Sequence, residues 1–224
     1  MSQDITTYMQ ALASRLPGLV TCLRDLGHGF HRPNDALPGP SGRVPQQIKQ
    51  LQGLVGAIPV SLLVFYRIVG SVDLTGSHPE WAGCEYADPL VVEPIDSAIE
   101  EALAYVELQD PKAEYSASES GIFRAPVAPD ALHKANVSGG MWYGIEIPNA
   151  VADPIVLEEP HALPFTRYLE FSLSWGGFPG LANAPATAGL LRPFVGQPGL
   201  PNKRLKLAAA LVAGGARSSS SAIR

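Results

Sequence analysis

The segment richest in reactive side chains is residues 78–88, which reads HPEWAGCEYAD. It carries the thiol of Cys84, the imidazole of His78 and three carboxylates. A cysteine nucleophile needs a general base and a group that orients this base. Nothing in the sequence places either group beside Cys84. The segment is therefore typical of a polar loop at a sheet edge with one half-buried thiol.

Two histidines, His28 and His31, could act as a pair of metal ligands. They lie in residues 27–45, which read GHGFHRPNDALPGPSGRVP. Zinc ligands usually come from a helix or from a turn with cysteines nearby, whereas this stretch is dense in glycine and proline. We expect two solvated loop histidines and no metal site. The stretch is long for a connection inside a domain, so it is either a functional loop or a poorly ordered insertion.

The motifs of several common enzyme classes are missing from the sequence. It has no phosphate-binding loop of the G-x-x-x-x-G-K-[ST] type and no dinucleotide fingerprint. Residues 138–141 read SGGM and lack the G-x-S-x-G pattern of a nucleophile elbow. The sequence therefore favours a protein that is not an enzyme, with no catalytic residue, no metal and no cofactor.

The charge of the chain is unevenly spread. Five basic residues and no acid lie between Lys203 and the end, and the preceding part holds 11 basic against 21 acidic residues, a balance of −10. Binding to nucleic acid needs clustered Lys and Arg, so the acidic part does not suit a nucleic-acid partner. It suits a basic protein partner that is steered in by electrostatic attraction.

Acidic and aromatic side chains gather in the 78–88 loop and in a predicted helix over 95–106. Carboxylates would attract a basic partner, and aromatic side chains would anchor it, because they are enriched at binding hot spots. The acidic helix face also fits an ordinary solvated surface. The remaining tryptophans, Trp142 and Trp175, are expected in the core. The partner-binding residues that we predict are Glu80, Trp81, Glu85, Tyr86, Asp88, Glu100 and Glu101.

Hydrophobic periodicity and turn residues predict the helices that would position these side chains. Pro17-Gly18 is expected to interrupt the first helix, and Gly70 to close the third. In the helix over 95–106, Ile95, Ile99, Leu103 and Val106 would face the core. The predicted helices cover residues 5–16, 46–54, 58–70, 95–106 and 164–175.

Short strands are predicted between these helices, with a turn at 75–77. Their order is too irregular for repeated βαβ units, which favours a single α+β domain with a short mixed or antiparallel sheet packed against several helices. This domain would span 1–182. The tail, 183–224, is rich in Ala, Gly, Pro and Ser, and we expect it to be disordered. The predicted strands cover residues 71–74, 89–92, 121–125, 141–147 and 155–157.

The cellular context follows from what the sequence lacks. No stretch approaches the roughly 20 apolar residues that span a bilayer. The N-terminus has an acid at Asp4 and polar residues where a signal peptide needs a basic patch and an apolar run. We therefore expect a cytoplasmic protein without membrane contact, in which Cys22 and Cys84 are free thiols. The oligomeric state is not indicated.

Residues 58–70, IPVSLLVFYRIVG, resemble the signature helix of the SUKH superfamily. Members of that family often show a Leu-Pro pair, a helix with Leu and Phe-Tyr, and then a small residue and glycine before a strand. Residues 88–92 (DPLVV), 141–147, 153–156 (DPIV) and 165–173 follow in a similar order, so the likeness covers roughly 46–178. The family often has Asn-Gly where this chain has Val69-Gly70.

The resemblance implies a binding module. Many bacterial members are immunity proteins that neutralise partner toxins, often nucleases, and eukaryotic relatives are regulatory scaffolds. The leading hypothesis is therefore a bacterial immunity protein that binds a basic toxin and occludes it. Two alternatives remain open, namely a regulatory scaffold and a small hydrolase that uses Cys84 or a histidine.

Overall fold

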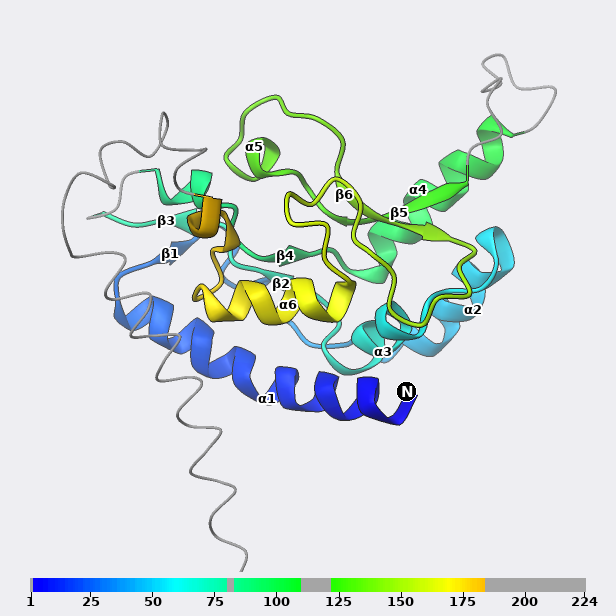
Figure 1. Cartoon of the computed structure of the whole chain (residues 1–224), viewed down its shortest axis with the longest axis horizontal. Helices are drawn as coiled ribbons and strands as arrows, with labels where there is room; N and C mark the ends of the chain where they lie inside the picture. The colour runs from blue at the N-terminus through cyan, green and yellow to red at the C-terminus, as the bar shows by residue number, and fades with distance from the viewer. Residues whose placement is uncertain (1, 80–82, 110–121, 184–224) are drawn as a thin grey trace, which may run out of the picture.

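The computed structural model describes residues 2–79, 83–109 and 122–183 of the chain (Figure 1). The α-helices are α1 (Ser2–Asp25), α2 (Val44–Val55), α3 (Val60–Ile68), α4 (Ile95–Leu108), α5 (Ala131–Lys134) and α6 (Phe165–Ser174), with 3-10 helices η1 (Cys84–Ala87) and η2 (Pro179–Asn183). The strands are β1 (Gly29–Phe30), β2 (Val72–Asp73), β3 (Gly76–Ser77), β4 (Val91–Val92), β5 (Phe123–Ala128) and β6 (Tyr143–Ile147). The chain is a mixed α+β domain, which confirms the predicted fold class. Apart from Asn183, the predicted tail lies outside the described residues.

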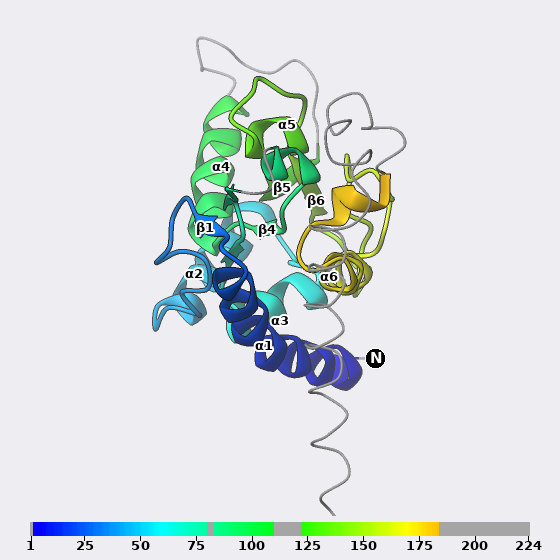
Figure 2. The ribbon, with the colours of Figure 1, turned by 90° about the vertical axis from the view of Figure 1, so that its left-hand side faces the viewer.

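The strands form three separate antiparallel pairs, β1–β3, β2–β4 and β5–β6, in place of the one mixed or antiparallel sheet that the sequence predicted. The longest pair, β5–β6, aligns Phe123 with Ile147 and Ala125 with Ile145. Figure 2 shows α4 and α2 on one side of this pair and α6 on the other. The predicted strand at 155–157 forms only isolated bridges, and the predicted turn at 75–77 instead contributes β3.

The first helix is longer than the sequence predicted, because α1 continues through Pro17 for another two turns. A proline inside a helix removes one backbone hydrogen bond and costs about 3 kcal/mol. The continuation buries Leu19, Val20 and Leu23, and each buried aliphatic side chain contributes roughly 1.5–3 kcal/mol. Burial therefore outweighs the local cost. Tyr8 Oη also donates to the Thr166 carbonyl at 2.9 Å, which ties α1 to α6.

Residues 27–45 are packed onto the body and are not a poorly ordered insertion. Ala36 is buried, and its carbonyl accepts a hydrogen bond from the Asp73 amide at 3.2 Å. Gly70 closes α3 as predicted, with φ +84°. A Cβ at Gly70 would lie 2.6 Å from the Gly39 backbone, so this position needs glycine both for its conformation and for the close approach of the loop.

The α4 helix is rotated relative to its predicted orientation. Ile95 and Ile99 are buried as expected, but Leu103 and Val106 are 49% and 41% exposed. Ala98 and Ala102 are fully buried in their place. The helix packs against α2 and β5, and small side chains allow that close approach. The apolar side chains of Leu103 and Val106 consequently face solvent in the described part of the chain.

A buried ion pair joins three segments that are distant in sequence. Lys134 Nζ, at the end of α5, lies 2.5 Å from Asp88 Oδ1, and both side chains are almost completely buried. Tyr143 Oη on β6 donates to Asp88 Oδ2 at 3.2 Å, and Lys134 Nζ lies 4.6 Å from the Tyr143 ring centroid. Asp88 adopts a left-handed conformation, with φ +53°. This cluster holds the 130–142 region onto the rest of the domain.

Replacing Lys134 by methionine should destabilise the fold by about 3–5 kcal/mol, because the Asp88 carboxylate would be left buried without its counter-charge. The double variant Asp88→Asn, Lys134→Met should recover a large part of that loss, since asparagine is uncharged and tolerates the left-handed conformation. Urea unfolding of both variants measures the difference. Equal stability of Lys134→Met and the native chain would contradict this account.

Candidate functional site

Two adjoining hollows share Glu93 and Ser97 at the start of α4. The larger one, here called the α4 groove, has a volume of about 460 Å³. One wall comes from α4 and from Glu93, which lies just before this helix. The other wall comes from the end of β5, from α5 and from the turn before β6. The groove is lined by Glu93, Ser97, Glu100, Glu101, Pro126, Ala128, Pro129, His133, Gly140 and Trp142.

The α4 wall of the groove is acidic. Glu100 and Glu101 are exposed, and Glu93 is half-buried where the two hollows meet. Two of these carboxylates lie on α4 and the third lies just before it, so their negative electrostatic potentials add. The opposite wall is mostly apolar, with prolines and an alanine from β5 and its end. The groove thus combines attraction for positive charge with an apolar contact surface.

Trp142 gives the apolar wall its largest side chain. The residue is half-buried, and its indole Nε1 is buried without a hydrogen-bond partner among the described residues. Buried donors are almost always satisfied in native proteins, so this unpaired N–H is an unfavourable group in the wall of the groove. Met141, the preceding residue, is 52% exposed. Together they place adaptable and aromatic apolar surface at the edge of the groove.

His133 is the basic residue of this groove, and it is held by Asp130. The Nδ1 atom of His133 lies 2.5 Å from Asp130 Oδ2. Asp130 also caps α5, because its Oδ1 accepts from the Leu132 amide at 2.8 Å and from the His133 amide at 3.2 Å. Burial opposes ionisation of Asp130, but these hydrogen bonds outweigh burial and lower its pKa. The pair is therefore a helix cap that also orients an exposed imidazole.

Glu93 carries its charge in an unfavourable place. Burial raises the pKa of this carboxyl, and the hydroxyl of Ser97, which donates to Glu93 Oε2 at 3.2 Å, only partly offsets the effect. The Glu93 amide donates to the Val127 carbonyl at 2.7 Å, which fixes the backbone between β4 and α4. The backbone holds the Glu93 carboxylate in this position, where a bound cation would stabilise its ionised form.

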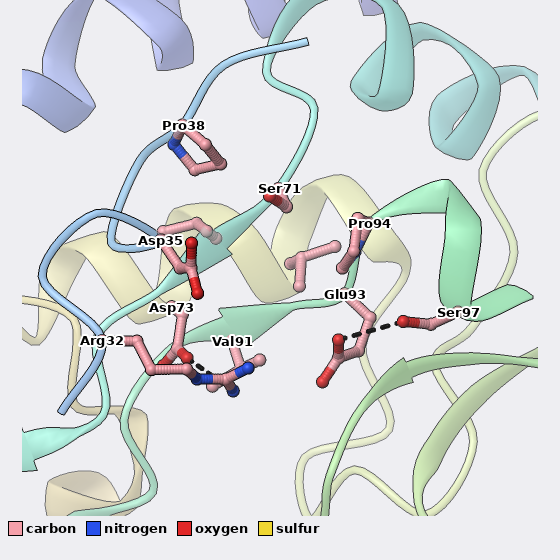
Figure 3. A pocket seen from close by; sticks show the side chains of 11 residues that line it. Arg32, Asp35, Pro38, Ser71, Asp73, Val91, Glu93, Pro94 and Ser97 are labelled. Atoms are coloured by element: carbon pink, nitrogen blue, oxygen red, sulfur yellow. Dashed lines mark hydrogen bonds and ion pairs between the residues drawn. The ribbon is translucent and has the colours of Figure 1, made fainter. Parts of the chain in front are cut away.

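The smaller hollow, here called the β2–β4 cavity, has a volume of about 310 Å³ (Figure 3). The 32–38 part of the long loop covers it, β2 and β4 form its floor, and the start of α4 closes it. Arg32 Nη2 lies 2.8 Å from Asp73 Oδ2. Asp73 Oδ1 accepts from Thr75 through the amide at 2.9 Å and the hydroxyl at 2.6 Å. Asp35 and Glu93 bring further carboxylates to the same walls.

The structure brings only part of the predicted partner-binding set together. Glu100 and Glu101 lie on the α4 groove. Glu85 and Tyr86 are half-buried in η1 and do not line the groove. Asp88 is not on the surface, because its carboxylate is buried as the counter-charge of Lys134. Glu80 and Trp81 lie outside the described residues.

Several residues of the two hollows were not singled out from the sequence, namely Arg32, Asp73, Glu93 and His133. Asp73-Leu74-Thr75 carries a local signal, since an aspartate often accepts a hydrogen bond from the residue two positions on. The other residues come together only through packing of distant segments. Trp142 was expected in the core and is half-buried, as is Trp175.

The two cysteines and the two loop histidines differ in how they are packed. Cys84 is buried, its Sγ lies 3.5 Å from the Gly76 carbonyl, and burial raises its pKa to about 12. Both cysteines are free, as predicted. His28 is buried against Phe30 and Phe178, contrary to the expectation of a solvated side chain. His31 is exposed. In the part of the chain that the structure describes, no group of three or more His, Cys, Asp or Glu could hold a metal ion.

Replacing Glu93 by glutamine should raise the melting temperature at pH 7, because glutamine fills the same space without a buried charge. The raised pKa means that ionised Glu93 opposes folding above that pKa, and that protonation relieves this cost as the pH falls through it. The difference between the two proteins should therefore shrink at acidic pH. Thermal unfolding followed by circular dichroism from neutral to acidic pH measures it. A lower melting temperature for the variant at pH 7 would contradict the assignment.

Comparison with protein-family models, with curated proteins and with solved structures finds no match to this chain. No helix among the described residues is long and apolar enough to cross a membrane. The functional conclusion consequently depends on the geometry of the α4 groove and of the β2–β4 cavity.

Proposed function

We propose that this chain is a non-enzymatic binding module that holds a basic protein in the α4 groove. The observation that carries the proposal is the pairing of acidic and apolar surface across one groove, with Glu100 and Glu101 facing the Trp142 wall. Charge complementarity speeds the encounter and excludes acidic partners. Desolvated aromatic and Met side chains supply the binding energy.

Two exposed apolar side chains are neighbours of groove residues. Leu103 lies one turn beyond Glu100 on α4 and is 49% exposed, and Met141, between Gly140 and Trp142 in the chain, is 52% exposed. Scattered exposed apolar residues are normal on a monomer. Beside an acidic groove they would add apolar contact area within a charged rim, which is the composition of a protein interface.

The biological role that we propose is that of an immunity protein, which occludes a basic toxin in the cytoplasm. The resemblance of residues 58–70 to the SUKH superfamily motivates this role. A regulatory scaffold would use the same groove, and the neighbouring genes separate the two roles, because an immunity gene lies beside the gene for its toxin.

Reversing the charge of the α4 wall should strongly reduce capture of the partner. The double variant Glu100→Lys, Glu101→Lys, immobilised as the full chain, should retain the basic partner from a lysate of the producing cells on the order of tenfold less than the native chain does at low salt. Both side chains are exposed, so the variant should fold normally. About 0.5 M salt should release the partner from the native chain, because exposed charges are screened at that ionic strength.

The matched control is Asp25→Lys, which reverses an exposed charge at the end of α1, outside both hollows. It should capture the partner as well as the native chain does. If the double variant and the native chain retain the same proteins, the α4 groove is not the binding surface.

A hydrolase is the second candidate, favoured by the Asp130–His133 pair at the groove. An oriented histidine is one part of a catalytic triad. The nearby hydroxyl of Ser97 donates to Glu93, however, and no described hydroxyl or thiol is hydrogen-bonded to His133. The buried Cys84, with its raised pKa, is unsuited to be the nucleophile.

Turnover of p-nitrophenyl acetate and labelling by a fluorophosphonate probe test the hydrolase candidate. The binding function predicts that neither rises above the background of a His133→Ala variant, whose side chain is 49% exposed in the native chain and whose loss should leave the fold intact. Labelling of Ser97 that disappears in His133→Ala would favour the hydrolase.

A further inference from the structure

The β2–β4 cavity contains more negative than positive charge. Asp35, Asp73 and Glu93 line it, and Arg32 is its one basic residue among those described. Figure 3 shows the carboxylates of Asp73 and Glu93 on either side of the Arg32 guanidinium. The volume of about 310 Å³ is at the lower end of small-ligand sites, so the cavity fits a single long side chain.

One acceptor in the wall of this cavity is incompletely satisfied. The Asp73 side chain is only 8% exposed, and its Oδ2 atom accepts no hydrogen bond of good geometry in the described residues. Arg32 Nη2 is 2.8 Å away and forms an ion pair with it, without a hydrogen bond of good geometry. A cation with better-placed N–H donors would satisfy this oxygen more completely.

Arg32 is held weakly in this position. Its side chain is 61% exposed and comes from the long loop over the cavity. Its charge also reaches Glu93, where it favours the ionised form. An exposed arginine is held less firmly than a buried one. A second cation that takes its place would keep the almost buried Asp73 carboxylate paired.

We infer that the β2–β4 cavity binds the guanidinium group of an arginine side chain from the basic partner, which replaces Arg32 between Asp73 and Glu93. This inference rests on the proposed function and names the anchoring contact of the partner. Glu93 lines both hollows, so an arginine in the cavity continues directly into the partner surface in the α4 groove.

Arginine suits this site better than lysine does. A guanidinium is planar and carries five N–H donors, so one group bridges two carboxylates. The oxygens available to it are Asp73 Oδ2 and the Glu93 carboxylate, of which only Oε2 receives the Ser97 hydroxyl. An ammonium group is a strongly hydrated point charge, which makes it costlier to desolvate in this cavity.

The test is a titration of the isotope-labelled full chain with Nα-acetyl-L-arginine N-methylamide, followed by amide chemical shifts. We expect saturable binding with a Kd on the order of 1 mM, as suits a single side chain. The shifts should centre on Ser71, Asp73, Glu93 and Ser97. The citrulline analogue has the same shape without the charge and should not bind, and the lysine analogue should bind several-fold more weakly.

Two variants should change this affinity in opposite directions. Arg32→Gln removes the competing internal cation and should strengthen arginine binding several-fold, whereas Glu93→Gln should weaken it on the order of tenfold. Weaker binding of the arginine probe to Arg32→Gln would overturn the inference, because Arg32 would then support the probe and not compete with it. Equal binding of the citrulline analogue, or shifts confined to Glu100 and Glu101, would also overturn it.

The same variants distinguish failure of this inference from failure of the proposed function. If Glu93→Gln still captures the basic partner while Glu100→Lys, Glu101→Lys does not, the α4 groove binds the partner and the cavity does not receive its arginine. If the arginine probe binds as expected but the native chain captures no basic protein, the cavity is a cation site and the proposed function fails.

Discussion

The geometry of the site depends on one buried ion pair, between Asp88 and Lys134. The two residues are 46 positions apart, and each charge is tolerable in the interior only because the other is present. The pair does more than join η1 to α5. His133 precedes Lys134, and Trp142 precedes Tyr143, the second partner of Asp88. A single buried contact therefore positions two residues of the wall that faces the acids of α4.

The start of α4 holds negative charge at a cost to stability. Glu93 is desolvated, Asp73 is almost buried, and the basic residue between them is an exposed arginine on a loop. Natural proteins keep such unfavourable groups mainly where they serve binding or catalysis. Glu93 and Ser97 line both the groove and the cavity, so a partner bound in one lies next to the other.

Burial overrides local propensity at several points of this fold. The α1 helix continues through Pro17 because the following turns bury three aliphatic side chains. His28 leaves solvent because the ring fits edge-on against Phe30 and Phe178, while its Nε2 atom stays 3.1 Å from the Leu74 carbonyl. In α4 a large apolar side chain is instead left in solvent. Leu103 stays exposed because the small side chains of Ala98 and Ala102 allow closer packing of the helix.

The sequence by itself determined the fold class and the presence of the longer elements. The helices α2, α3 and α4, the stop at Gly70 and the strand β6 follow from residue types and short-range spacing. It also indicated that Glu100 and Glu101 are exposed, because the outward face of a helix can be recognised from residue spacing within that helix alone. Only the tertiary structure decided that Asp88 is buried and that Arg32, Asp73 and Glu93 meet, since these contacts join segments whose approach is governed by packing of the whole core and leaves no periodic signal in the chain.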